Sequence, residues 1–202
     1  MGHRFAEIAF TPSVKAAQEQ NGSRRSYARF EGGEPTRHRL GEREAEFIAA
    51  RDSFYMATVS ETDWPYIQHR GGPPGFLRVL DEKTIGFADF SGNRQYISVG
   101  NLAGNDRVSL FLMDYANRTR LKVLGRVRLF APDDAEMMRK LTLDGAETRI
   151  ERGFLIEIEA FDWNCPQHIT ERYTLADVEH ATAALRARIA ELEARLHQGH
   201  AS

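Results

Sequence analysis

Alternating apolar and polar residues run through the middle of the chain and predict its main elements. Side chains of a β-strand point to opposite faces in turn, so a period of two indicates a strand. Seven such segments cover residues 54–59, 66–70, 76–80, 84–89, 108–114, 120–130 and 153–161. No long alternation of strands with amphipathic helices accompanies them, which disfavours a doubly wound parallel sheet. The pattern predicts a mainly β, α+β fold: a small barrel of six or seven mostly antiparallel strands with flanking helices.

Apolar residues at helical spacing predict helices before and between the strands. The predicted helices cover residues 14–20, 43–53 and 133–141. Ser13 is expected to cap the first of them, and Asn21-Gly22 to end it. Residues 23–39 are charged and contain glycine and proline, so they are expected to run irregularly over the surface.

The C-terminal tail carries the strongest helical signal. Thr174-Leu175-Ala176-Asp177 is a capping box, and Gly199 is expected to stand past the end of the helix. Between them, seven positions alternate in spacing between three and four residues, as in the seam of a coiled coil. They are Leu175, Val178, Thr182, Leu185, Ile189, Leu192 and Leu196. The helix either pairs with a helix of a second subunit or lies on its own barrel.

The patterns divide the chain into three parts. With 202 residues, it has the length of one ordinary domain plus appendages. Residues 1–40 are expected to form an N-terminal extension and residues 41–165 the barrel domain. Residues 166–202 are expected to form a C-terminal segment and a long helix associated with a dimer partner.

Composition argues against several classes of protein. The 12 Phe, 6 Tyr and 2 Trp are spread along the chain, which argues against disorder. No apolar run approaches the length needed to cross a bilayer, so no membrane association is expected. A net charge of −2 argues against nucleic-acid binding, which favours a basic surplus. The single cysteine, Cys165, excludes an internal disulfide and a multi-thiolate zinc site and indicates a reducing, cytoplasmic setting; no metal site is predicted.

The stretch after the fourth predicted strand has the strongest signal for binding an anion. It runs through Ser91-Gly92 into a predicted helix and places Asn93, Arg94 and Gln95 at the helix start. Free backbone N–H groups and the helix dipole favour an anion there and disfavour an arginine. An anion bound between Arg94 and these N–H groups accounts for the arginine. Alternatively, Arg94 is solvated or paired with Asp89.

Two further polar clusters lie on predicted strands. In Gln68-His69-Arg70, the period of two places the first and third residues on one face and His69 on the other. The strand is expected to begin in the buried middle of the sheet, where polar groups need partners, unless the cluster marks an exposed strand end. Arg118, Arg120 and Lys122 alternate onto one face of a later strand, a pattern also typical of a solvated edge. With Arg94, the clusters indicate a phosphate-bearing ligand.

Five motifs between residues 54 and 127 follow one another in a specific order. They are Phe54-Tyr55-Met56-Ala57-Thr58-Val59, Trp64-Pro65-Tyr66-Ile67-Gln68-His69-Arg70, Gly86-Phe87-Ala88-Asp89 with Asn93-Arg94-Gln95, Asn105-Asp106-Arg107-Val108-Ser109-Leu110, and Leu124-Gly125-Arg126-Val127. In this order and spacing, residues 45–165 resemble the pyridoxamine 5′-phosphate oxidase-like superfamily of FMN-binding split barrels. The resemblance implies an antiparallel split β-barrel and a homodimer with two FMN sites at the subunit interface.

The resemblance also implies residues for the cofactor. In the family, a strand arginine and a Ser-Arg-Lys turn hold the FMN phosphate. Arg70 is the counterpart of the strand arginine, and Asn93-Arg94-Gln95 replaces the turn with only its arginine retained. Arg120 falls where the family has a strand glutamine near the flavin. The expected cofactor-binding residues are Gln68, His69, Arg70, Asn93, Arg94, Gln95 and Arg120.

The C-terminal part departs from the family. The oxidases have an Arg-Leu-His-Asp-Arg segment that binds the substrate phosphate, and this chain has residues 161–169 in its place, so the vitamin oxidase activity is not implied. Trp163, Asn164, Gln167 and His168 are expected to line the open face of the flavin and orient a substrate. Alternatively, Trp163 belongs to the core and His168 to the surface. No catalytic residue is identified, and a nucleophilic role for Cys165 is disfavoured.

Three functional hypotheses follow. The first is an FMN-dependent oxidoreductase acting on an unidentified small-molecule substrate or electron donor. The second is a non-enzymatic FMN carrier, redox sensor or partner of a reductase. The third is a split barrel that holds a deazaflavin or a haem instead, with His69 as the axial candidate for haem.

Overall fold

The computed structural model describes residues 2–143, 149–164 and 166–200, so Cys165 lies outside the described residues. The chain forms two compact units. The first comprises residues 1–114 and 120–165, and the second comprises residues 115–119 and 166–202. The expected N-terminal extension and the barrel thus fall in one unit.

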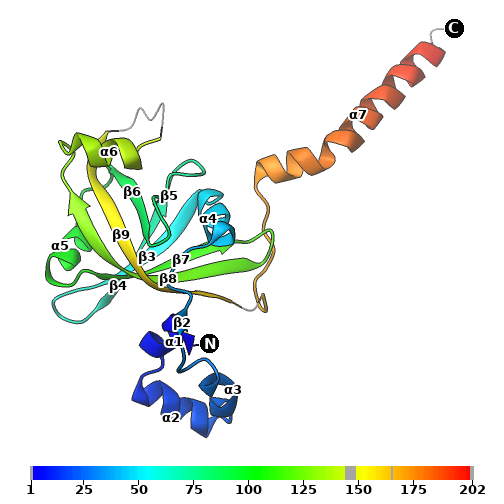
Figure 1. Ribbon diagram of the computed structural model, residues 1–202. Coiled ribbons are helices and arrows are strands. Elements are labelled where there is room, and N and C mark those ends of the chain that lie inside the picture. The colour runs from blue at the N-terminus through cyan, green and yellow to red at the C-terminus, as the bar shows by residue number, and fades with distance from the viewer. Residues whose placement is uncertain (1, 144–148, 165, 201–202) are drawn as a thin grey trace. The chain divides into compact units, whose positions relative to one another are not determined.

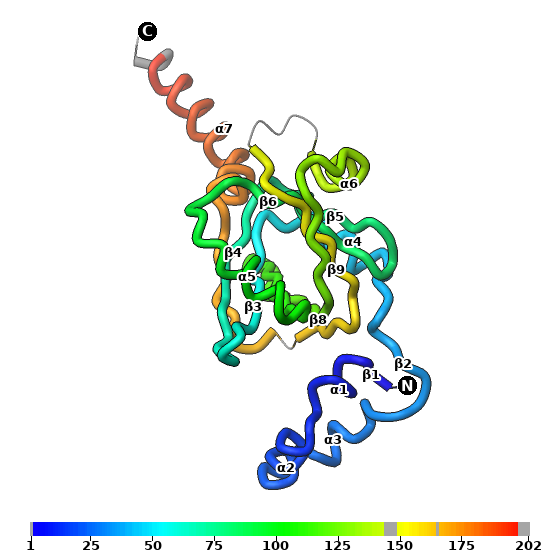
Figure 2. Tube along the Cα trace, turned by 90° about the vertical axis from the view of Figure 1, so that its left-hand side faces the viewer, coloured from blue at the N-terminus to red at the C-terminus, as the bar shows by residue number. Residues whose placement is uncertain are grey.

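The first unit is built on a seven-stranded sheet with the order β4-β3-β7-β8-β9-β6-β5. The pairs β3–β4, β3–β7, β5–β6, β6–β9 and β8–β9 are antiparallel, and the strands curl around a shared interior (Figure 2). This confirms the antiparallel split barrel. The strand of the Gln68-His69-Arg70 cluster was expected to begin in the buried middle of the sheet. This strand, β4, instead lies at one end of the strand order. The strands are β3 (Ser53–Val59), β4 (Pro65–Gly71), β5 (Arg78–Val79), β6 (Thr84–Phe90), β7 (Arg107–Asp114), β8 (Thr119–Phe130) and β9 (Ile150–Trp163).

The core is built from these strands; β3 and β7 bury every second residue as predicted, whereas β6 buries five residues in a row and β9 buries Leu155 as well as its neighbours. Phe54 and Met56 of β3 are fully enclosed, as are Phe154 and Ile156 of β9. The rings of Phe87 and Phe154 stack with centroids 4.7 Å apart, so β6 and β9 share one aromatic layer. Burial of these side chains supplies the main driving force for closing the barrel.

Short helices surround the barrel (Figure 1). The helices α1, α2 and α3 lie in the N-terminal extension. Residues 23–39 of the extension contain α3 and a short strand, whereas an irregular course was expected. The helix α2 begins at Pro12 because the Thr11 hydroxyl accepts the Val14 N–H at 3.4 Å, so Ser13 is not the cap. The helices are α1 (Arg4–Ala9), α2 (Pro12–Gln20), α3 (Arg24–Ala28), α4 (Glu42–Ala49), α5 (Ile97–Gly104) and α6 (Ala135–Leu141).

The N-terminal extension is attached to β8 and β9. Strands β1 (Gly2–His3) and β2 (Pro35–Thr36) pair in parallel and bring the two ends of the extension together. The Phe161 N–H donates to the Arg37 carbonyl at 2.8 Å, and helix α1 packs against β9. The extension is therefore packed against the C-terminal part of β9.

The second unit is dominated by α7 (Leu175–His200). The Asp177 carboxylate accepts the Thr174 N–H at 2.8 Å, and the Thr174 hydroxyl accepts the Asp177 N–H at 3.1 Å, which confirms the capping box. The helix runs to His200, so the prediction that it ends before Gly199 is wrong. Within the described ranges, no helix is long and apolar enough to cross a membrane.

Candidate functional site

A loop of six residues, 91–96, connects β6 to α5 and forms one wall of the candidate site. Arg94 and Tyr96 both adopt left-handed backbone conformations, with φ of 60° and 53°. The Asn93 side-chain oxygen accepts the Gln95 N–H at 3.2 Å. This local turn competes with helix formation, so α5 begins only at Ile97. The prediction that the helix starts at residues 93–95 is therefore wrong.

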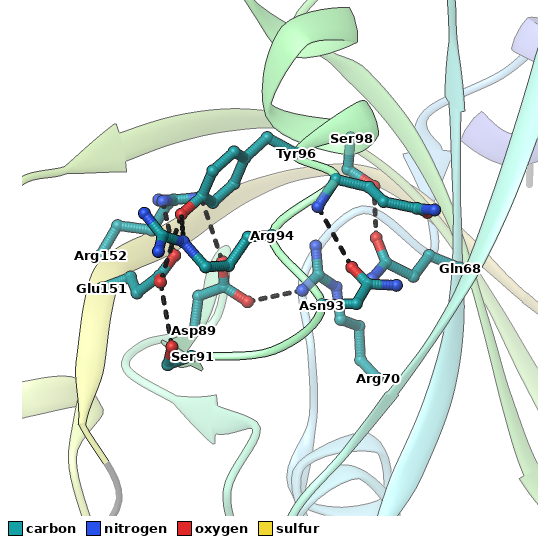
Figure 3. Close-up of polar contacts among 11 residues, drawn as sticks. Gln68, Arg70, Asp89, Ser91, Asn93, Arg94, Tyr96, Ser98, Glu151 and Arg152 are labelled. Carbon is teal, nitrogen blue, oxygen red and sulfur yellow. Dashed lines mark hydrogen bonds and ion pairs between the residues drawn. The ribbon is translucent and has the colours of Figure 1, made fainter.

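A cavity of about 200 Å³ lies between this loop, β4, β6 and β9 (Figure 3). Three of its side chains are arginines and two are carboxylates, contributed by segments far apart in the sequence. Its lining residues are Gln68, Arg70, Asp89, Phe90, Gly92, Asn93, Arg94, Tyr96, Ser98, Val99, Glu151 and Arg152.

A buried ion-pair network forms the floor of the cavity. The Arg70 Nη1 lies 2.5 Å from Asp89 Oδ1, and the Arg152 Nη1 lies 3.4 Å from Asp89 Oδ2. Arg152 also pairs with Glu151 at 2.9 Å. Burial lowers the pKa of Arg70 although Asp89 opposes the shift, and burial raises the pKa of Asp89 against the attraction of the two arginines. The floor is therefore a poorly solvated region in which an additional charge is felt strongly.

One donor of this network has no partner among the described residues. The Nε of Arg70 is buried and makes no hydrogen bond with any of them. The Arg70 guanidinium lies 5.2 Å from the ring centroid of Phe154 and 5.7 Å from that of Phe87, which holds the side chain in place without satisfying the Nε. A buried donor without a partner costs free energy, so an acceptor at this point would stabilise the site.

Arg94 stands at the rim and is bound differently. Its Nε donates to the Tyr96 hydroxyl at 3.1 Å, and that hydroxyl donates to Glu151 at 3.3 Å. The hydrogen bond that Arg94 donates to Tyr96 and the charge of Glu151 raise the pKa of Arg94. Within the described part of the chain, Arg94 makes no ion pair, and Asp89 is paired with Arg70 and Arg152. The expected alternative, a pair between Arg94 and Asp89, is therefore not formed.

The arrangement is suited to binding a small anion. Three arginines and two carboxylates leave a net charge of +1 around the cavity. Ser98 and Val99, in the first turn of α5, line the cavity, and the first N–H groups of a helix have no partner within it. Both carboxylates of the cavity are engaged by arginines, so neither is a free acid or base.

The structure brings some of the predicted cofactor residues together. Gln68, Arg70, Asn93 and Arg94 line the cavity, and the Gln68 side-chain oxygen accepts the Ser98 hydroxyl at 2.9 Å. Gln95 and His69 do not line it. The His69 ring is exposed on the opposite face of β4, at 5.5 Å from the ring of Tyr55.

Arg120 lies elsewhere in the first unit, together with two of the predicted substrate residues. Arg120, Trp163 and Asn164 line a second cavity, and the Arg120 N–H donates to the Asn164 side chain at 2.8 Å. The Trp163 indole donates to Glu44 at 2.7 Å and packs edge-on against Phe47 at 4.8 Å, beside the core.

The remaining predicted residues belong to the second unit. Gln167 and His168 are exposed there. Arg118, expected beside Arg120 on a strand face, lies in the turn before β8 with φ of 50° and pairs with Glu171 at 3.3 Å. The prediction of three basic residues on one strand face is therefore wrong for Arg118.

Several residues of the cavity were not predicted: Tyr96, Ser98, Glu151 and Arg152. Glu151 and Arg152 reach the site because β6 and β9 pair with Asp89 opposite Arg152. That register depends on a contact across more than 60 residues of sequence, which no local pattern encodes. A signal was present for Asp89, since an acid in an otherwise buried strand needs a cationic partner.

Comparison with known proteins agrees with this architecture. A family model described as pyridoxamine 5′-phosphate oxidase matches residues 40–161, more than half of the chain. Among solved structures, HupZ of Group A Streptococcus is 15% identical and has a TM-score of 0.51, with 66% of this chain and 99% of that chain covered. A candidate pyridoxamine 5′-phosphate oxidase from Lactobacillus delbrueckii is 19% identical and has a TM-score of 0.50, with 63% and 96% covered. No curated protein matches the chain.

Proposed function

Since the chain belongs to the pyridoxamine 5′-phosphate oxidase family, we propose that it is a flavoprotein that binds FMN by its phosphate and uses it as an oxidoreductase on a small molecule. FMN, when bound, supplies the redox chemistry, and the residues of the chain bind and orient it. The scarcity of cysteine supports a reducing compartment, so the proposal places the protein in the cytoplasm.

The observation that carries the proposal is the set of unused donors around the small cavity. Arg94 has no carboxylate partner among the described residues, and the Arg70 Nε is buried without an acceptor. Ser98 and Val99, in the first turn of α5, line the same cavity, and the first N–H groups of a helix have no partner within it. A phosphate ester has enough acceptor oxygens for all three, and bonds between ionised groups are the strong ones. The residues present therefore fit the phosphate of FMN.

The size of the cavity supports a site shared by two subunits. Its volume of about 200 Å³ is below the roughly 300–1,000 Å³ of pockets that enclose a whole cofactor. We propose that a second copy of the chain covers the flavin ring, giving a homodimer with FMN at the interface. The outer face of the β3–β4 pair is apolar enough for this contact, because Ile67 is 65% and Trp64 74% exposed, with Tyr55 nearby.

The dimer is tested by sedimentation equilibrium of the Ile67→Glu variant. A charge at the centre of the proposed contact is expected to give a monomer with less bound FMN. Leu129→Glu, which alters an exposed leucine on β8, is the matched control and is expected to stay dimeric. A monomeric wild-type protein that holds FMN fully would contradict the dimer.

A non-enzymatic FMN carrier or reductase partner is the second candidate. Asp89 and Glu151 are paired with arginines, and neither carriage of FMN nor hydride transfer needs a free acid or base, so kinetics separates the two candidates. Anaerobic reduction by NADH or NADPH, followed by rapid reoxidation by a small acceptor, is expected of an oxidoreductase, whereas a carrier would be reduced only through a partner protein.

The cofactor itself is tested by the visible spectrum of the purified protein and by mass spectrometry of the ligand that denaturation releases. The expected result is a flavin spectrum and the mass of FMN. A deazaflavin or haem spectrum would contradict the proposal. So would a colourless protein that does not bind added FMN.

A further inference from the structure

A second, larger cavity of about 620 Å³ lies where the N-terminal extension meets β8 and β9. The extension contributes Phe5, Phe10, Tyr27 and Phe30 to its lining. None of the residues that line it also lines the small cavity proposed for the FMN phosphate. Its volume is within the roughly 300–1,000 Å³ typical of ligand pockets. The cavity is therefore a separate space with room for an organic molecule.

The aromatic side of this cavity is already ordered. Phe10 and Tyr27 meet edge-on with ring centroids 5.6 Å apart, and Tyr27 and Phe30 are 6.0 Å apart. The Phe30 ring also stacks on His3 at 4.4 Å. Rings held in place by one another lose little conformational entropy when a ligand binds. This wall suits the faces and edges of another aromatic ring.

The cavity is also lined by cationic residues, and Lys122 Nζ lies 4.8 Å from the ring centroid of Phe5. Asp162 is shared by two cations, at 2.6 Å from Arg37 Nη1 and 2.8 Å from Lys122 Nζ. Arg120 makes no ion pair with any described residue, and its Nε is buried without a hydrogen-bond partner. Its guanidinium instead lies 5.5 Å from the ring centroid of Phe111. Three cations and one carboxylate leave the lining with a net charge of +2.

We propose that this cavity binds a planar aromatic molecule that carries a carboxylate. The carboxylate pairs with Arg120, whose planar guanidinium matches carboxylate geometry and whose buried Nε gains an acceptor. The aromatic body lies against Phe10, Tyr27 and Phe30, where it is removed from water. The two cavities have no lining residue in common, so this site can be tested separately from the one proposed for the FMN phosphate.

Isothermal titration calorimetry with 1-naphthoate and its neutral analogue 1-naphthamide tests the charge requirement. The wild-type protein is expected to bind naphthoate saturably and naphthamide at least about tenfold more weakly, because a hydrogen bond to a charged group is lost. Arg120→Gln is expected to weaken naphthoate binding by a similar factor, and Arg120→Lys by less. Arg128→Gln, an exposed arginine on the same strand, is the matched control and is expected to bind like the wild type.

A second variant tests the location without touching the charge. Gln18 lines the cavity from the half-buried side of α2 and accepts a hydrogen bond from Arg24 at 3.1 Å, so Gln18→Trp is expected to fill the cavity and abolish naphthoate binding while circular dichroism shows a folded protein. Three results would overturn the proposal: no saturable binding of naphthoate, equal binding of naphthamide, or full binding by Gln18→Trp. Displacement by FMN together with weaker binding in Arg94→Ala would also overturn it, because naphthoate would then occupy the phosphate cavity. The flavin proposal is tested by the visible spectrum of the purified protein, which does not depend on naphthoate. A negative result for naphthoate binding is therefore distinguishable from a negative result for FMN.

Discussion

Replacing Arg70 by methionine is expected to destabilise the barrel strongly. The Arg70 and Asp89 side chains are only 12% and 9% exposed and approach to 2.5 Å. Removal of one partner of a buried pair costs about 3–5 kcal/mol, because the other charge stays buried. Arg152, at 3.4 Å, still compensates Asp89 in part, so we expect the lower end, about 3 kcal/mol. For a chain of this length, that corresponds to a decrease in Tm of roughly 6–12 °C.

Urea unfolding followed by circular dichroism measures this loss, and a double-mutant cycle identifies its cause. Asp89→Asn in the Arg70→Met background is expected to cost much less than the two single changes together, because the uncompensated carboxylate is gone. Arg126→Met is the control, since Arg126 makes comparably short ion pairs with Asp106 and Glu159 but is 49% exposed. The reasoning is refuted if Arg70→Met and Arg126→Met lower the stability equally, or if the effects of Arg70→Met and Asp89→Asn simply add.

Two predictions concern α7. If the exposed seam pairs between subunits, Leu185→Asp with Ile189→Asp is expected to lower the mass measured by light scattering after size exclusion, and an unchanged mass would exclude this pairing. The hydrogen bonds from Thr174 lower the pKa of Asp177 below its ordinary value of 3.8, so its stabilisation of the helix is present above that value and is lost as the pH falls through the lowered one. Helical circular dichroism is expected to show this loss in the wild type but not in Asp177→Asn, and identical titrations would contradict it.

The sequence carried most of the information on the barrel because short apolar runs, several of them with every second residue buried, mark its strands. Phe54 and Met56, or Phe154 and Ile156, indicate both a strand and the face that enters the core. The capping box at Thr174 could also be predicted from the sequence, because its two hydrogen bonds join residues only three positions apart. Such local patterns predict which elements form, but not which elements pair.

The candidate site depends on those pairings and on backbone conformations without a local signal. Arg70 belongs to a three-residue polar cluster in the sequence, and only the fold shows that Asp89 neutralises it and that Arg152 shares the same carboxylate. Arg94 and Tyr96 take left-handed conformations that are uncommon for such residues, so the start of α5 was misplaced. Arg120 was expected beside the cofactor, but in the first unit it lies against the N-terminal extension. The second cavity was therefore not predicted at all.

The most direct test of the account is a titration of the protein with FMN, followed by the quenching of flavin fluorescence. Arg94→Ala removes the arginine that has no carboxylate partner in the described structure, and alanine keeps the Cβ, so the backbone conformation costs the same. Arg107→Ala is the matched control, because the Arg107 Nε is also bound only locally, to Asn105 at 3.0 Å, and lies outside the cavity. The account predicts that Kd rises about ten- to hundredfold for Arg94→Ala and is unchanged for Arg107→Ala. Equal affinities of wild type and Arg94→Ala would show that the phosphate is not held in this cavity.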